Sequence, residues 1–242
     1  MLDASITRPR RVGHKGAAHI EPGNTLASFD AALHHGVDMI ELDVLAERPD
    51  GSGRLLVAHD YRDMREREPL RFERALEHLR GESFGGIELD VDVKWRGYEH
   101  RVLGALRDFD LIGRTLLSGM HTESLDLIRA AEPGLRLGWS VPRVRRDYTT
   151  DALTAVPALA ILTGYRAMLP RRARAALMAK RFDAIMAHWR VVTRALVRAV
   201  GEGGGDLYVW TVDSAAQIAR LTAMGVDGII TNDPRLFEAA AR

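Results

Sequence analysis

The sequence predicts a closed α/β barrel of parallel strands. Short β-like runs alternate with helical stretches along the chain, as in βα units arranged around a parallel sheet. Eight such runs occur, and eight is the strand number at which parallel sheets close. The chain has 242 residues, 46% of them hydrophobic, which is common for one barrel, so residues 1–242 are predicted to form a single domain.

The expected strands are short, and a helical stretch follows each of them. The strands are expected near residues 11–13, 39–45, 87–93, 115–118, 135–141, 184–187, 207–212 and 228–231. The helices are expected near residues 25–35, 71–80, 99–109, 124–131, 172–180, 194–201, 215–224 and 234–241. Asn24 or Thr25 can cap the first helix and Thr193 the sixth, which places their starts.

Two excursions break the alternation. Residues 46–60 contain the turn signal Pro49-Asp50-Gly51 before an apolar run, which predicts a hairpin after the second strand that carries His59 back over the barrel mouth. Residues 142–171 are long and rich in arginine, and they are interpreted as an irregular fifth βα unit or as a lid. The irregular unit is slightly favoured.

The second expected strand, residues 39–45, strictly alternates apolar and acidic side chains. Glu41 and Asp43 therefore point to the same side, between apolar neighbours. An antiparallel surface strand alternates in the same way, so this strand alone leaves both interpretations open. The third strand repeats the pattern with Glu88, Asp90 and Asp92, followed by Lys94. Four charges on an inward face are costly without partners or a metal, which favours a functional site.

Histidines and a lysine flank this acidic pair along the chain. His14 and Lys15 follow the first strand, and His59 ends the hairpin. Histidines exchange protons near neutral pH, carboxylates hold hard cations, and a lysine binds anions. In a parallel barrel, groups at the carboxyl ends of the strands meet at one mouth. The combination predicts chemistry on a phosphate ester.

Composition narrows the class of protein further. The chain has no cysteine, which excludes disulfides, thiolate catalysis and cysteine-ligated metals. Its start lacks the pattern of a signal peptide, and the longest apolar run, residues 155–162, is too short to span a bilayer. We therefore expect a soluble, cytoplasmic protein.

The formal charge of +1 conceals a basic segment. Residues 143–200 hold twelve Lys or Arg and three Asp, a local net charge of +9. This segment is interpreted as a solvated helical face or as a surface for anionic ligands and transient membrane contact. Nucleic acid is not an expected partner, because few aromatic residues accompany the arginines. The sequence does not predict the oligomeric state.

With these residues placed, the chain resembles the glycerophosphodiester phosphodiesterase family, whose fold is a (β/α)₈ TIM barrel. The family pattern of His-Arg, Glu-x-Asp and His-Asp corresponds to His14-Lys15, Glu41-Leu42-Asp43 and His59-Asp60. Further matches are residues 24–29, Asp92-Val93-Lys94, residues 209–213 and residues 225–234. The likeness spans nearly the whole chain and implies hydrolysis of a glycerophosphodiester, or a related small phosphodiester, to glycerol phosphate and an alcohol.

The resemblance also implies roles for single residues. Glu41, Asp43 and Asp92 would hold a divalent metal, Mg²⁺ or Ca²⁺, and Lys15 and Lys94 would bind the phosphate. His14 and His59 would be the general base and the general acid. In the family the nucleophile is a neighbouring substrate hydroxyl, giving a cyclic phosphate that water then opens.

Four departures from the family pattern bear on the activity. Lys15 stands in place of Arg, Gly23 in place of a Glu, and Asp92 in place of a Glu, and the segment between His59 and the next helix is shorter. Two alternatives therefore stay open beside the hydrolase. One is a phospholipase-type or cyclising lyase on lipid head groups, and the other is a phosphate-binding barrel without catalysis.

Overall fold

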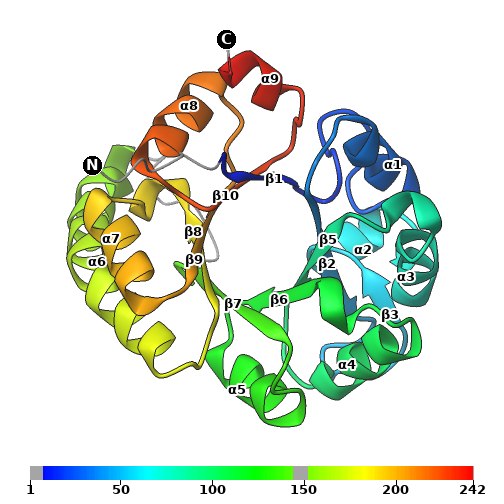
Figure 1. The fold of residues 1–242 in the computed structure, drawn as a ribbon. Coiled ribbons are helices and arrows are strands. Elements are labelled where there is room, and N and C mark those ends of the chain that lie inside the picture. The colour runs from blue at the N-terminus through cyan, green and yellow to red at the C-terminus, as the bar shows by residue number, and fades with distance from the viewer. Residues whose placement is uncertain (1–7, 144–151, 242) are drawn as a thin grey trace.

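Eight parallel strands close into a barrel, as predicted. The structure is a computed structural model that describes residues 8–143 and 152–241. The barrel strands are β1 (Arg10–Gly13), β2 (Met39–Ala46), β5 (Glu88–Val93), β6 (Thr115–Gly119), β7 (Arg136–Val141), β8 (Ala184–His188), β9 (Asp206–Trp210) and β10 (Gly228–Thr231). Each pairs in parallel with the next, and β1 pairs with both β2 and β10, which closes the ring (Figure 1).

A short hairpin follows β2, also as predicted. Strand β3 (Leu55–Val57) runs antiparallel to the end of β2, with Val44 opposite Val57. Helix α2 (Asp63–Glu66) and the two-residue strand β4 (Leu70–Arg71) complete the excursion before the barrel resumes. The excursion adds no separate insertion domain, and it places His59 directly after β3.

Helices form the outer ring around the strands (Figure 1). They are α1 (Leu26–His34), α3 (Phe72–Leu79), α4 (Glu99–Asp108), α5 (Thr122–Ala131), α6 (Ala152–Met178), α7 (Arg194–Gly203), α8 (Ala215–Met224) and α9 (Leu236–Ala240), with 3₁₀ turns η1 (Glu82–Phe84), η2 (Ile112–Arg114) and η3 (Trp189–Val191). Thr25 caps α1, because its hydroxyl accepts a hydrogen bond from the Ser28 amide at 3.2 Å. Each helix buries an apolar stripe against the strands, which positions the barrel's loops.

Residues 142–171 belong to the fifth βα unit, as predicted, but the expectation that this unit is irregular is wrong from residue 152 onward. Helix α6 runs from Ala152 to Met178, through both Pro157 and Pro170. Leu169, Ala173 and Leu177 recur every fourth residue, are buried, and belong to the cluster that packs α6 against α7. The two prolines conceal this period in the sequence, since proline normally ends a helix.

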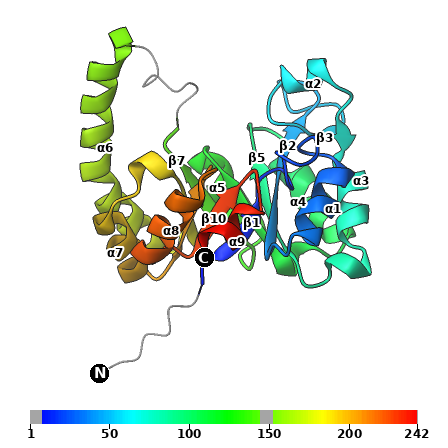
Figure 2. The ribbon, with the colours of Figure 1, turned by 90° about the horizontal axis from the view of Figure 1, so that it is seen from above.

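The basic segment therefore lies mostly on α6 and α7. Residues 144–151 of it are outside the described part of the chain. Helix α6 extends beyond the barrel at the same end as α2, on the opposite flank from it (Figure 2). Within the described residues, no helix has the length and apolar character needed to cross a membrane.

The amino ends of the barrel strands are closed by charged side chains. Arg136 lies at the start of β7 and forms ion pairs of 3.0 Å with Glu88 and with Asp206, which begin β5 and β9. Arg10, at the start of β1, also pairs with Glu88. Above this layer a buried apolar cluster that includes Met39, Tyr208 and Ile230 fills the interior. A functional cavity is consequently left to the carboxyl ends of the strands.

Candidate functional site

A cavity of about 140 Å³ opens at the carboxyl ends of the strands. It is lined by charged residues on one side and by a largely apolar wall on the other. The charged side consists of His14, Glu41, His59, Asp90, Asp92 and Lys94, and the other side includes Met120, Met186, Trp210 and Ile230. Five of the seven residues predicted as the site therefore line this inner cavity, and the remaining two, Lys15 and Asp43, contact its charged side.

The three predicted carboxylates form one cluster. Oxygens of Glu41, Asp43 and Asp92 lie within 4.8 Å of one another. The register of the sheet explains this, because Asp43 on β2 is paired directly with Asp92 on β5, and Glu41 precedes Asp43 on the same face. Lys94 Nζ lies 2.6 Å from Asp43 Oδ1 and 2.7 Å from Asp92 Oδ2.

The cluster is short of positive charge. Burial, and then the Asp43 carboxylate, raise the pKa of Glu41 well above its usual value. Burial alone would also raise the pKa of Asp43, but the ammonium groups of Lys94 and Lys15 outweigh it and hold this pKa well below the usual range. Burial raises the pKa of Asp90, one layer deeper, to about 7. A further cation would relieve this repulsion, and clustered carboxylate oxygens suit Mg²⁺ or Ca²⁺, so the residues fit the implied metal.

Asn24 holds Asp43 in place, a role that sequence reasoning missed. Its side-chain amide donates to Asp43 Oδ2 at 2.8 Å, and its Oδ1 accepts from the Asp43 backbone N–H at 3.2 Å. The backbone of Asn24 is left-handed, with φ of 62°, which asparagine tolerates better than most residues. Of the two caps considered for α1, Thr25 is the cap and Asn24 supports the acidic cluster.

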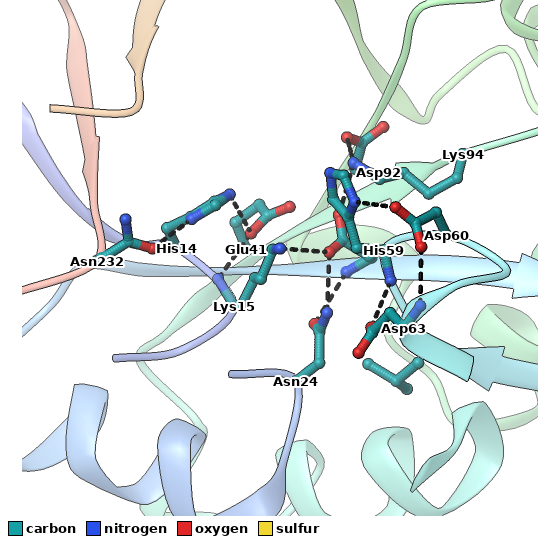
Figure 3. Close-up of polar contacts among 12 residues, drawn as sticks. His14, Lys15, Asn24, Glu41, His59, Asp60, Asp63, Asp92, Lys94 and Asn232 are labelled. Carbon is teal, nitrogen blue, oxygen red and sulfur yellow. Dashed lines mark hydrogen bonds and ion pairs between the residues drawn. The ribbon is translucent and has the colours of Figure 1, made fainter. Parts of the chain in front are cut away.

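Lys15 points into the site instead of into solvent. Its Nζ lies 3.6 Å from Asp43 Oδ2, and its backbone N–H donates to Glu41 Oε2 at 2.7 Å (Figure 3). The turn that allows this is tight, since Lys15 has φ of 53° and Gly16 has φ of 83°. A Cβ on Gly16 would lie 2.5 Å from the Ser28 carbonyl oxygen, so glycine is required there. The turn thus directs the ammonium toward the carboxylates.

His14 is fixed by residues from the other end of the chain. Its Nδ1 lies 2.6 Å from Asn232 Oδ1. Asp213 sets the orientation of that amide, because it accepts hydrogen bonds from Asn232 Nδ2 at 2.7 Å and from the Asn232 backbone N–H at 2.8 Å. Nδ1 of His14 must therefore be the donor, which leaves Nε2 without a proton and 3.8 Å from Glu41 Oε2.

Burial and the neighbouring Lys15 ammonium lower the pKa of His14 to about 4. The imidazole is then neutral at pH 7 and free to accept a proton at Nε2. Asp213 and Asn232 belong to sequence motifs noted above, but only their proximity to His14 in the fold shows what they do.

His59 stands where the hairpin returns to the mouth. Its Nδ1 lies 3.3 Å from Asp60 Oδ2, and its backbone N–H donates to Asp63 Oδ2 at 3.0 Å (Figure 3). About half of its side chain is exposed. His59 lines the inner cavity together with His14, so the predicted pair of histidines does meet at one site.

Comparison with known sequences points to one family. Models of the glycerophosphoryl diester phosphodiesterase family match residues 14–68 and residues 206–235, which hold both histidines and the Asp213–Asn232 support. A glycerophosphodiester phosphodiesterase of Caldanaerobacter subterraneus is 24% identical over 255 residues, covering 92% of this chain and 93% of the relative. One from Bacillus altitudinis is 27% identical over 256 residues, covering 91% and 93%.

Solved structures share the barrel. A glycerophosphodiester phosphodiesterase from Parabacteroides distasonis aligns with a TM-score of 0.74 at 16% identity, covering 97% of each chain. A phosphodiesterase from Oleispira antarctica, solved with the product sn-glycerol-3-phosphate, aligns with a TM-score of 0.69 at 16% identity, also covering 97% of each chain. The ordered motifs and the sequence matches support the glycerophosphodiester phosphodiesterase family, a family of phosphoric diester hydrolases, and the solved structures support the barrel fold.

Proposed function

We propose that this barrel hydrolyses a small glycerophosphodiester to glycerol phosphate and an alcohol. One observation carries the proposal: two histidines, two lysines and three carboxylates from four separate segments meet at the inner cavity, where five of them line it and the other two contact the residues that do. That set provides a proton acceptor, a proton donor, cations for phosphate and ligands for a metal. The names of the relatives and the product held by the Oleispira structure support a phosphodiester as the substrate.

Glu41, Asp43 and Asp92 are the residues that would hold a divalent cation, Mg²⁺ or Ca²⁺. When bound, such an ion neutralises the carboxylates and polarises a phosphoryl oxygen. Lys94 already lies against two of the three carboxylates and remains a cation beside the phosphate position. Lys15 approaches the same group of oxygens from the β1 side.

His14 is the proposed general base. It is neutral at pH 7, and the Asp213–Asn232 pair fixes its tautomer, so that Nε2 faces the cavity with a free lone pair. A substrate hydroxyl beside the phosphate can give its proton to this atom as it attacks phosphorus. His14 thus begins the reaction, and the orientation of its ring is set before substrate arrives.

His59 is the proposed general acid. It lies across the cavity mouth from His14, on a different segment, and Asp60 contacts its Nδ1. Protonated His59 can therefore give a proton to the departing alcohol oxygen. In a second step, water opens the cyclic phosphate with the two histidines in exchanged roles.

A turnover screen tests the proposed function. We expect purified protein to release glycerol phosphate and a free alcohol from glycerophosphodiesters when Mg²⁺, Ca²⁺ or Mn²⁺ is supplied. Cyclic phosphate as the final product would support the lyase instead. Tight binding of glycerol phosphate with no turnover in any of the three metals would support the binding protein and contradict the hydrolase.

Lys15 permits a separate prediction about phosphate binding. Lys15→Met should lower kcat/KM by a factor equivalent to about 1.5–3 kcal/mol of transition-state binding, the range for a hydrogen bond to a charged group. The reason is that methionine keeps most of the length of the side chain but loses its charge. Lys15→Arg should be tolerated, since a guanidinium retains the charge and grips two phosphate oxygens. The measurement is kcat/KM for both variants on one diester. An unchanged value for Lys15→Met would assign the phosphate to Lys94 and the metal.

A further inference from the structure

A second cavity, of about 400 Å³, lies beside the inner one at the barrel mouth. Lys15, Gly23 and Asn24 form its wall on the β1 side, and Arg62, Asp63 and Arg67 form its wall on the α2 side. His59 lines both cavities, whereas His14 lines the inner cavity. The histidine proposed to protonate the departing alcohol is thus the side chain that joins the two spaces.

Gly23 keeps this outer cavity open. A Cβ at this position would lie 3.0 Å from the Cβ of Ala18, 3.0 Å from the Cβ of Lys15 and 3.3 Å from the Cδ of Lys15. The backbone of Gly23 is not in the left-handed region, so glycine is required here for space and not for conformation. Any side chain would enter the cavity or push Lys15 aside. The brief excursion from β3 to α3 supplies the opposite wall through Arg62, Asp63 and Arg67.

The wall of the outer cavity is strongly polar and electrically balanced. It carries three cations, Lys15, Arg62 and Arg67, and three acidic residues, Asp60, Asp63 and Glu66. Most of these charges are already paired across short distances. The pairs are Arg67 with Asp63 at 2.6 Å, Arg62 with Glu66 at 2.6 Å, and His59 with Asp60 at 3.3 Å.

This wall suits one class of alcohol. Paired charges leave oxygen acceptors and N–H donors for hydroxyl groups, but no unbalanced charge for an ionic ligand. Among the described residues that line the cavity, only His59 has an aromatic ring, so no aromatic cage surrounds a quaternary ammonium group. The apolar contribution is limited to Ala18, Pro22 and Gly23, too little to accept an acyl chain.

We propose that the outer cavity binds the alcohol part of the diester and selects uncharged polyhydroxy alcohols. The inference rests on the proposed function, because it takes the phosphate to lie at the inner cavity and the leaving oxygen to face His59. Gly23 is then a specificity-determining residue that never contacts the phosphate.

The test compares three diesters that share glycerol phosphate and differ in the alcohol: inositol, choline and methanol. For the unmodified protein, kcat/KM for the inositol ester should exceed that for the choline ester by about tenfold or more. Gly23→Gln, which projects an uncharged side chain into the cavity, should lower kcat/KM for the inositol ester by about tenfold and change that for the methyl ester by less than about threefold. Glu21→Gln is the matched control, because Glu21 is exposed on the same loop and does not line the cavity.

Each other result overturns the inference in a recognisable way. If Gly23→Gln lowers kcat/KM equally for all three esters, Gly23 acts through Lys15 and the phosphate, and the cavity does not select the alcohol. If the choline ester is hydrolysed as well as the inositol ester, the proposed class of alcohol is wrong while the hydrolase stands. If no ester is hydrolysed by the unmodified protein, the proposed function fails and this inference fails with it.

Discussion

Asp43→Asn should abolish hydrolysis, lowering kcat by on the order of 10³-fold or more, while the barrel stays folded. Asp43 is fully buried and is the one carboxylate that contacts both lysines and Asn24. The substitution keeps the shape of the side chain but removes its charge, so the site loses a metal ligand and the central partner of Lys94. Circular dichroism should still show a cooperative thermal transition, and activity should be undetectable in the same sample.

Chelation provides the companion measurement. Excess chelator should abolish turnover and lower the Tm, because a cation that binds only the folded state stabilises it, and added Mg²⁺ or Ca²⁺ should restore both. The Tm of Asp43→Asn should respond much less to either treatment. Asp126→Asn serves as the control, since Asp126 is an exposed carboxylate that pairs with Arg181 on the outer surface. Full activity in excess chelator would contradict the metal-dependent reaction.

His14→Ala and His59→Ala should each lower kcat by about 10²–10⁴-fold, the usual contribution of one proton-transfer group. Both side chains line the cavity, but neither belongs to the acidic cluster that would hold the metal. Metal binding, followed by titration calorimetry, should therefore be largely retained. The split between reduced kcat and retained metal affinity separates a role in catalysis from damage to the site.

The control for this pair is His100→Ala, at an exposed position of α4. It should match the unmodified protein in both measurements. A rate near that of the unmodified protein for either site variant would remove that histidine from the mechanism. If His59→Ala alone keeps a rate near that of the unmodified protein, water, and not His59, supplies the proton to the leaving alcohol.

The alternation of β2 and β5 made most of the fold and the acidic cluster predictable. A strand with carboxylates at every second position places them on one face, and parallel pairing of neighbouring strands then brings Asp43 level with Asp92. The hairpin was predictable for a similar reason, because Pro49-Asp50-Gly51 is a local turn signal. Each of these features starts from a pattern within one short stretch of chain, a two-residue alternation or a turn, and the regular order of the barrel strands then brings the stretches together.

The contacts that support the site residues were harder to predict from the sequence. Asn24 lies next to the predicted cap of α1, and a local interpretation of the sequence assigns it there, yet it bonds to a residue 19 positions away. In α6 the local signals conflict. Leu169, Ala173 and Leu177 have the fourfold spacing of a buried helix face, but Pro170 predicts a break in the helix. Packing of this apolar stripe against α7 keeps the segment helical in spite of the prolines, and the local sequence does not show the partner helix that provides this packing.

The hydrogen bond between His14 and Asn232 also bears on how the protein is made. The two residues are 218 positions apart, and the His14 backbone N–H donates to Thr231, the last residue of β10. His14 is translated early, but its ring can be oriented only after β10 and Asn232 have been synthesised and have folded against β1. Such long-range pairing is slow to form, since the whole chain must be gathered first. Assembly of a competent site is therefore expected only after β10 has been synthesised, and a nascent barrel lacking β10 would be without its oriented base.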